Sequence, residues 1–392
     1  MTPAARVRTA IELLDAIIAA AAARGAPADR ILADWFRSSR FAGSKDRRAI
    51  RELVFAAIRA CGPVPASGRA AMLRLAELDT AIAPLFDGSN YGPAPIDAAE
   101  RPAEGGIAPG WLAARLAASD IVGDEAAALL DRAPLDLRVN TLKADRATLA
   151  LPQEALTTPA PQGLRLPPGA PVEQWEAFRS GAVEVQDTGS QLACLAVGAQ
   201  PGETVVDLCA GAGGKTLALA AAMDSLGRLV ASDTDRGRLS RLAPRAARAG
   251  ATIIETRLLD PGREIEALGD LAGQADAVMV DAPCSGTGTW RRNPEARWRL
   301  TEAELARLCA TQAQVLDVAA ALVRPGGRLV YVTCSLLDEE GADAFAAFLA
   351  RHPGFAARPL ALPLGAPRGG GVRLTPWRDG TDGFFIACAA RS

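Results

Sequence analysis

The first sixty residues show the spacing of apolar positions that is typical of helices packed on one side. Between residues 4 and 60, apolar side chains recur every three or four residues and so share one helical face; they are Val7, Ile11, Leu14 and Ile18, and later Ile50, Leu53, Val54, Ala57 and Ile58. Charged residues occupy many of the positions between them. The pattern predicts an all-helical N-terminal module.

The pattern changes after this module. Residues 87–110 are rich in glycine and proline, which predicts a long loop or linker, and helical spacing resumes from Trp111 to Leu130. From about Ala133 to 185 the chain is expected to form short strands and turns. We therefore expect one domain over residues 1–132 and a second region over residues 133–392, which begins with a small subdomain at 133–190.

The rest of the chain alternates strand-like apolar runs with helical stretches. The alternation is typical of a parallel α/β sheet and predicts a doubly wound, Rossmann-like core over residues 191–392, with strands at 205–208, 228–232, 251–255, 276–280 and 328–333. Sheets of this class bind ligands beyond the carboxyl ends of their strands. That rule selects five residues as a candidate site: Cys209, Asp233, Asp281, Cys284 and Cys334.

Composition narrows the classes of protein that remain. The chain has 392 residues, a net charge of −2 and a single histidine, His352. One histidine argues against a Ser-His-Asp triad and against a multi-histidine zinc site, so we expect no metal. The small net charge gives no global sign of nucleic-acid binding, and any such role must rest on local patches.

The cysteines and the N-terminus indicate a cytoplasmic protein. Seven cysteines are spread along the chain without a CxxC pair, which is typical of free thiols in a reducing compartment. Glu12 and Asp15 interrupt the apolar stretch near the N-terminus, so a secretory signal is not expected. No run reaches the roughly 18 apolar residues of a membrane span, and we expect no membrane partner.

A glycine-rich turn follows the first strand of the alternating region. Residues 205–216 read VVDLCAGAGGKT, in which glycines let backbone approach a ligand and a helix N-terminus offers N–H groups to an anion. A P-loop is one interpretation, because GxxxxGK[ST] is matched except at Cys209 and AVMVD at 277–281 resembles a Walker B strand. Against it, Asp233 ends the second strand 19 residues after Gly214, where adenosine-binding folds place an acid on the ribose.

Two cysteines and an aspartate follow the later strands, in DAPCSG from Asp281 and in VTCS around Cys334. Two thiols beside a carboxylate, with no histidine, suit the methylation of a pyrimidine at carbon-5. A thiolate adds to carbon-6, an acid stabilises the ring nitrogen, and carbon-5 can then attack a methyl donor. A second group must afterwards help to eliminate the enzyme.

Together the motifs resemble the RsmB/Nop/Sun family of RNA cytosine-5 methyltransferases. The matching segments span residues 134 to 390 and are RVNTLK at 138–143, VQDTGSQLA at 185–193, the CAGAGGKT turn, DAPCSG, VTCS, and DGFFIA at 382–387. The chain departs from the family at Ala212, where proline is frequent. We expect this change to loosen the turn without removing a group that faces the ligand.

The resemblance implies a cofactor, S-adenosylmethionine, and roles for individual residues. It places Asp233 on the ribose, Asp260 near the adenine, and Asp281 at the junction of cofactor and target base. In such families Cys334 of the Thr-Cys motif is the nucleophile and Cys284 of the Pro-Cys motif assists release. The cofactor turn corresponds to Cys209, Ala210, Gly211, Ala212, Gly213, Gly214 and Lys215.

Basic segments are candidates for RNA contact. The stretch KDRRAIRELVFAAIR at 45–59 is similar to the NusB-type RNA-binding domain of bacterial ribosomal-RNA members and has a basic face formed by Arg47, Arg48, Arg51 and Arg59. Arginines and tryptophans at 290–299 suit phosphate contacts and base stacking, or else form a buried tryptophan pair with a charged rim.

The sequence thus predicts an enzyme that methylates carbon-5 of a cytidine in RNA, specifically small-subunit ribosomal RNA, with S-adenosylmethionine as donor. Two alternatives stay open. One is a P-loop-like nucleotide hydrolase, and the other is a non-catalytic RNA-binding assembly factor.

Overall fold

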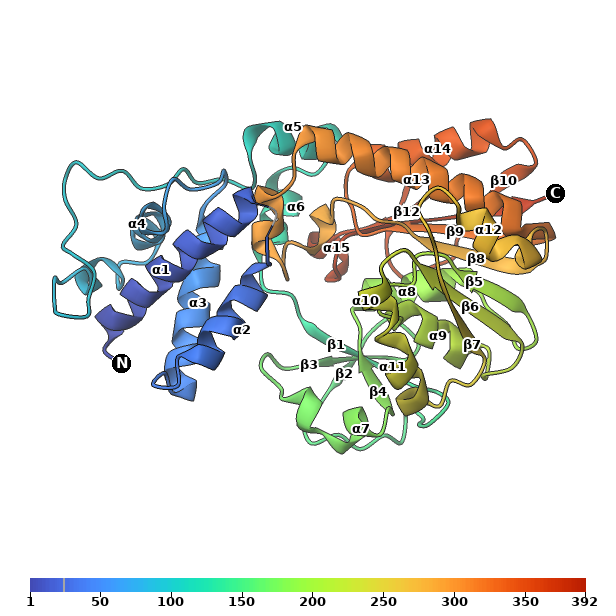
Figure 1. Cartoon of the computed structure of the whole chain (residues 1–392), viewed down its shortest axis with the longest axis horizontal. Helices are drawn as coiled ribbons and strands as arrows, with labels where there is room; N and C mark the ends of the chain where they lie inside the picture. Colours follow the sequence, from blue (N-terminus) through green and yellow to red (C-terminus); the bar gives the residue numbers. More distant parts are fainter. Residues whose placement is uncertain (24) are drawn as a thin grey trace. The chain divides into compact units, whose positions relative to one another are not determined.

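The computed structural model describes residues 1–23 and 25–392, and the chain divides into two compact units. The first unit contains Met1–Asp131 and Thr289–Thr301, and the second contains Arg132–Gly288 and Glu302–Ser392. Arg24, inside the range expected to be helical, lies outside the described residues. The elements of both units are labelled in Figure 1.

The first unit is helical, as the apolar spacing predicts. Val7 and Leu14 of the first helix are fully buried in one core with Ile50 and Val54 of the third. The helical spacing over 111–130 is confirmed and corresponds to more than one helix, separated where the chain turns with positive φ at Asp120. The helices are α1 (Pro3–Ala22), α2 (Ala28–Ser38), α3 (Ser44–Ala60), α4 (Gly68–Leu78), α5 (Gly110–Ala118) and α6 (Gly123–Ala127).

The loop between α4 and α5 is held against the first unit. Residues 87–109, all within the described chain, form neither helix nor strand. Arg69 of α4 pairs with Glu100 and donates hydrogen bonds to the carbonyls of Ala94 and Pro95. The expected linker is therefore packed on the helices that precede it.

The segment Thr289–Thr301 is part of the helical core and not an exposed basic surface. Trp290 and Arg297 are fully buried, and Trp298 is 6% exposed. The interpretation of these three residues as an RNA-facing set is wrong, and the buried alternative is confirmed. The guanidinium of Arg297 donates hydrogen bonds to three backbone carbonyls, at Ile58 (2.7 Å), Cys61 (2.5 Å) and Pro294 (2.6 Å).

The basic face expected on α3 is engaged largely within the same unit. Arg47 donates to the carbonyl of Ala42 (2.8 Å), and Arg51 pairs with Asp29 (2.8 Å). The guanidinium of Arg59 lies 5.7 Å from the ring centroid of Phe55. Arg48, in contrast, is exposed.

The second unit begins with a small antiparallel sheet in the order β2-β3-β1-β4. Leu137, Leu164 and Val183 are buried on it together with Trp175, from the helical turns near α7 (Glu176–Arg179). The strands are β1 (Leu135–Val139), β2 (Leu156–Thr157), β3 (Gly163–Leu166) and β4 (Val183–Val185).

The main sheet has the strand order β11-β12-β13-β9-β8-β5-β6-β7, and β10 pairs with β13. The run from β9 to β7 is parallel, and β10 to β13 are joined in antiparallel fashion. The strands are β5 (Thr204–Asp207), β6 (Arg228–Asp233), β7 (Ile254–Leu258), β8 (Ala275–Asp281), β9 (Val323–Thr333), β10 (Phe355–Arg358), β11 (Ala366–Arg368), β12 (Gly371–Leu374) and β13 (Phe384–Arg391).

Helices cover both faces of this sheet (Figure 1). Val205 and Val206 point to opposite faces, because side chains alternate along a strand, and they belong to two separate apolar clusters. The doubly wound, Rossmann-like fold is thereby confirmed. One cluster contains α8 (Thr188–Val197), α9 (Gly214–Ala222) and α11 (Leu242–Ala249), and the other α12 (Glu264–Leu268), α13 (Glu302–Leu322) and α14 (Ala342–Arg351).

The strand expected at 251–255 is displaced by three residues. Its pairing with β6 starts where Leu229 faces Ile254, and the amide of Thr252 is bound instead by the hydroxyl of Ser225 (2.8 Å). Within residues 1–23 and 25–392, no helix combines the length and the apolar character needed to cross a membrane.

Candidate active site

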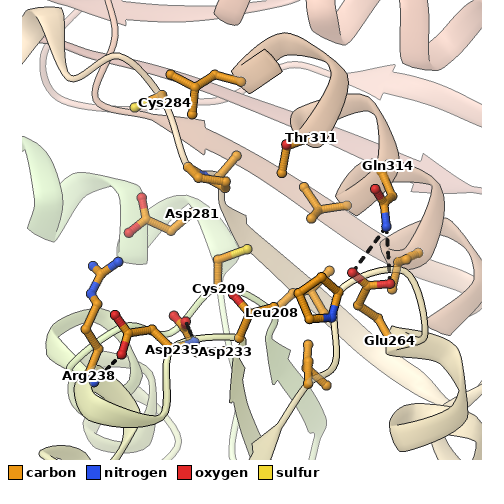
Figure 2. Close-up of a pocket in the computed structure, with 18 of the residues that line it drawn as sticks. Leu208, Cys209, Asp233, Asp235, Arg238, Glu264, Asp281, Cys284, Thr311 and Gln314 are labelled. Atoms are coloured by element: carbon orange, nitrogen blue, oxygen red, sulfur yellow. Dashed lines mark hydrogen bonds between the residues drawn. The ribbon is translucent and has the colours of Figure 1, made fainter. Parts of the chain in front are cut away.

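A pocket of about 560 Å3 lies at the carboxyl ends of the parallel strands. Figure 2 shows residues from successive strand ends facing it. All five residues selected by the strand-end rule line this pocket, each one just after or at the end of its strand: Cys209, Asp233, Asp281, Cys284 and Cys334.

The glycine-rich turn requires glycine where the backbone is left-handed. Gly213 has a φ of 84°, and a Cβ there would lie 2.1 Å from Cδ1 of Leu242. L-residues with side chains seldom adopt such angles. The turn thus brings the start of α9 close to the sheet edge at which Asp233 lies.

Asp233 is fixed by backbone amides of its surroundings. Its carboxylate, in a residue 7% exposed, accepts from the Gly211 amide at Oδ2 and the Asp235 amide at Oδ1, both at 2.7 Å. Each carboxylate oxygen has a second lone pair, so a hydroxyl pair of a ligand could still be bound. The neighbouring pocket wall includes the apolar side chains of Leu259 and Val315, which suit a flat heterocycle.

The carbonyl of Ala212 has a partner that was not anticipated. Nη1 of Arg245 donates to it at 2.6 Å, and Nη2 of the same arginine pairs with Glu184 of β4 at 2.9 Å. These two contacts of Arg245 fix the turn at Ala212, the position where the family often has proline.

Not every residue of the implied cofactor set reaches the pocket. Cys209 lines it, whereas the described lining does not include residues 210–215. Asp260 is exposed and stands between two lining residues, Leu259 and Pro261, without being one itself. Its role near an adenine remains a prediction.

Lys215 is bound to a carboxylate of the site. Its Nζ lies 2.7 Å from Oδ2 of Asp281 and 5.6 Å from the ring centroid of Phe384. Burial disfavours the ammonium, but the charge of Asp281 and the hydrogen bond to it outweigh burial and raise the pKa of Lys215. This pairing argues against the P-loop alternative, in which the lysine amine reaches a phosphate.

The two candidate cysteines touch. Their sulfurs are 3.4 Å apart, and both residues are partly exposed. The hydrogen bond with Cys334, followed by burial, raises the pKa of the Cys284 thiol well above its usual range. Cys284 therefore keeps its proton at neutral pH and can donate its S–H to the sulfur of Cys334.

The motifs VQDTGSQLA and DGFFIA support the loop that carries Cys284. Asp187 caps α8 by accepting from the Gly189 amide (2.7 Å), and its other oxygen accepts from the Asp382 amide (3.1 Å). The Gly383 amide then donates to the carbonyl of Gly288 (2.8 Å), at the end of the Pro-Cys loop. These motifs are close to the site without lining the pocket.

Asp207, at the end of β5, is a second buried acid near the pocket. Its Oδ2 accepts from the Thr216 hydroxyl at 2.6 Å. Burial raises the pKa of Asp207 to about 7, the charge of Asp281 adds to the increase, and the hydrogen bond from Thr216 opposes it. Among the described residues, no group of three or more His, Cys, Asp or Glu side chains could hold a metal ion.

Asp207→Asn is expected to change how stability depends on pH. The wild-type carboxyl binds its proton more tightly when folded, so between pH ~4 and pH ~7 the folded state holds more protons than the unfolded state, and stability falls as pH rises. The asparagine variant has no carboxyl group at this position and therefore lacks this decrease in stability with rising pH. Urea unfolding at pH 5 and pH 7.5 should show a smaller decrease for the variant; equal decreases would contradict the expectation.

Comparison with known proteins agrees with the resemblance seen in the motifs. A family model described as 16S rRNA methyltransferase RsmB/F matches residues 194–389. The probable ribosomal RNA small subunit methyltransferase B of Synechocystis sp. is 39% identical over 269 residues, which are 64% of this chain and 59% of that protein. Ribosomal RNA small subunit methyltransferase B of Xylella fastidiosa (strain 9a5c) is 37% identical over 291 residues, which are 71% and 67% of the two chains.

A solved structure extends the similarity along the chain. The crystal structure of PH0851 is 27% identical, with a TM-score of 0.77, and the match covers 99% of both chains. In the comparison with the Synechocystis protein, the chain spans about three fifths of that relative's length.

Proposed function

The chain belongs to the RsmB/F family of 16S rRNA methyltransferases, and we propose that it methylates carbon-5 of a cytidine in small-subunit ribosomal RNA. The observation that carries this proposal is the contact of 3.4 Å between the sulfurs of Cys284 and Cys334. The pair lies at the rim of a pocket whose other strand ends supply Asp233 and Asp281. Ribosomal RNA as substrate would place the activity in the cytoplasm.

The pocket residues fit S-adenosylmethionine. Asp233 would hold the ribose hydroxyls, Cys209 at the start of the glycine-rich turn would face the methionine part, and the apolar wall at Leu259 would face the adenine. When bound, this cofactor supplies an electrophilic methyl group to the substrate base.

The residues of the chain would divide the chemistry between them. Cys334 adds as a thiolate to carbon-6, forming an S–C6 bond, and the ring nitrogen takes up a proton as electron density reaches carbon-5. Carbon-5 then takes the methyl group. Loss of the carbon-5 proton, return of the proton from the ring nitrogen and cleavage of the S–C6 bond restore the ring and free Cys334 as a thiolate. Asp281, oriented by Lys215, would be the carboxyl group at the junction of cofactor and target base, and Cys284 would assist the release.

We also propose that the helical residues 1–132 form a NusB-like RNA-binding domain. The helices of the first unit and the exposed Arg48 support a role in backbone contact. A duplex substrate would require the target base to leave its stack to reach the cysteines.

Bisulfite sequencing of ribosomal RNA from a deletion strain tests the proposed reaction. Loss of one methylated cytidine, restored by the wild-type gene and not by a Cys334→Ala gene, is the expected result. Restoration by both genes would point to the alternative of a non-catalytic assembly factor. Titration calorimetry adds a test of the cofactor, since tight binding of ATP but not of S-adenosylmethionine would support a nucleotide hydrolase.

Asp233→Ala is expected to weaken S-adenosylmethionine binding by roughly 1.5–3 kcal/mol, about 10- to 150-fold, because a hydroxyl pair loses a charged acceptor. Calorimetric titration measures the change, and circular dichroism checks that the variant is folded. Asp343→Ala is the matched control and should bind like the wild type, because its side chain is exposed on α14 and does not line the pocket. Unchanged affinity in a folded Asp233→Ala protein would contradict the assignment of the ribose site.

A further inference from the structure

Glu340 is a buried carboxylate beside the cysteine pair for which the proposed chemistry has no role. It ends the turn Asp338–Glu340, six residues after Cys334, and is 0% exposed. Its Oε1 accepts from the Ser285 amide (2.8 Å) and from Nε2 of Gln312 (3.0 Å), and its Oε2 accepts from the Ser285 hydroxyl. A buried carboxylate is costly unless its oxygens are hydrogen-bonded, so these donors fix its position.

These contacts hold the peptide that carries Cys284 on both sides. Ser285, which follows Cys284, is bound by Glu340 through its amide and its hydroxyl. On the other side, Nε2 of Gln312 in α13 donates to the carbonyl of Pro283 at 2.9 Å. The hydroxyl of Tyr331 donates to the backbone carbonyl of Glu340 at 2.7 Å, which attaches the backbone of Glu340 to β9.

A second link joins the residues that follow the two cysteines. Oγ of Ser285 lies 3.2 Å from Oγ of Ser335, and Ser335 directly follows Cys334. This hydroxyl contact therefore accompanies the sulfur contact one residue earlier in each loop. The Thr287 hydroxyl extends the link, 3.1 Å from Oγ of Ser335.

We infer that Glu340 is a positioning residue that holds the Pro-Cys loop against the Thr-Cys loop and so keeps the sulfurs of Cys284 and Cys334 in contact. Glu340 acts through Ser285 and not on the reacting atoms. The effect of Glu340 on catalysis rests on the proposed function. The effect of Glu340 on the distance between the two sulfurs is independent of that function.

The distance between the sulfurs can be tested without RNA or cofactor. Phenylarsine oxide binds two neighbouring thiols at once, forming two As–S bonds and releasing water without any redox change. The wild-type protein should capture one equivalent across Cys284 and Cys334, located by peptide mass spectrometry and lost in Cys284→Ala. In Glu340→Ala, three donors lose their acceptor and the loop is released, so capture should slow at least about tenfold.

The conservative variant separates geometry from charge. In Glu340→Gln the amide oxygen can accept from Ser285 and Gln312, and the amide N–H can donate to the Ser285 hydroxyl. Capture should therefore stay within about threefold of the wild type. Glu339→Ala, the same change at the neighbouring and partly exposed position, is the matched control and should react like the wild type. Methylation by Glu340→Ala should show a reduced kcat with KM for RNA little changed, and Glu340→Gln should recover it.

Each outcome supports or overturns the inference. Wild-type capture rates in Glu340→Ala, or equally slow capture in Glu340→Gln, would overturn it. The two assays can also give different answers. If capture is slow in Glu340→Ala and normal in Glu340→Gln, the positioning role is supported. If the wild-type protein then methylates no RNA, only the proposed function is contradicted. If circular dichroism shows that Glu340→Ala is unfolded, Ser285→Ala is the variant to test, because it removes only the hydroxyl contacts of Ser285 with Glu340 and Ser335. Slower capture by Ser285→Ala would support the inference. An unchanged capture rate would overturn it.

Discussion

Replacing Cys334 with alanine is expected to abolish methyl transfer and every covalent protein–RNA complex. The variant has no thiolate that can add to carbon-6, and without that adduct carbon-5 of the pyrimidine stays a poor nucleophile. Cys284 is not expected to substitute: its hydrogen bond with Cys334 is lost in the variant, but burial still raises the pKa of its thiol and so disfavours the thiolate. Transfer of a labelled methyl group and denaturing gels of protein–RNA mixtures measure both effects.

Cys284→Ala should give a different result in the same assays. Addition and methyl transfer remain possible, but elimination is slowed, so a denaturant-resistant band should accumulate in the presence of S-adenosylmethionine. Cys388→Ala, a buried cysteine of β13, is the control and should show neither effect. A band with Cys334→Ala in place of Cys284→Ala would reverse the assignment of the two cysteines.

The architecture of the sheet could be predicted because its parallel strands are buried on both faces and so appear as continuous apolar runs. The strands predicted at 205–208, 228–232 and 276–280 match β5, β6 and β8 to within one residue at each end. The antiparallel strands were not predicted. The pairing of β13 with β9, in which Phe385 faces Thr333, joins residues about fifty positions apart, and local spacing carries no information on such a partner.

The sequence predicted the part of the candidate site that lies at the ends of the parallel strands. Carboxyl ends of parallel strands meet at one edge, so Cys209, Asp233 and Asp281 had to lie near one another once the sheet was known. Glu340 and Arg245 were not found. Each acts through hydrogen bonds to residues of other loops, and a charged residue with such partners has no distinguishing pattern in the sequence.

The basic segment after the Pro-Cys motif shows the same limit of sequence patterns. Arginines interleaved with tryptophans suit both an RNA-facing surface and a buried cluster, and the structure buries Trp290, Arg297 and Trp298 in the helical unit. The segment Thr289–Thr301 leaves the second unit at Gly288 and returns to it at Glu302. Removing residues 1–131 would consequently expose Trp298, which packs in the helical core and donates to the carbonyl of Gly62 (3.2 Å).

Arg297→Met is therefore expected to destabilise the helical unit strongly. Burial lowers the pKa of Arg297 to about 10, so the guanidinium is still charged at neutral pH and donates to three buried carbonyls. Methionine preserves much of the side-chain volume but leaves those carbonyls without their donor, at a cost of about 1–3 kcal/mol for each group. The expected loss is about 3 kcal/mol or more in the free energy of unfolding.

Urea unfolding followed by tryptophan fluorescence measures this loss, because Trp298 lies in the affected core. Arg30→Met is the matched control: its guanidinium makes an exposed i,i+4 pair with Asp34, and such pairs contribute little to stability. A midpoint that shifts no further in Arg297→Met than in Arg30→Met would mean that the carbonyls of Ile58, Cys61 and Pro294 find other donors. The segment would then be held by the burial of its tryptophans and not by Arg297.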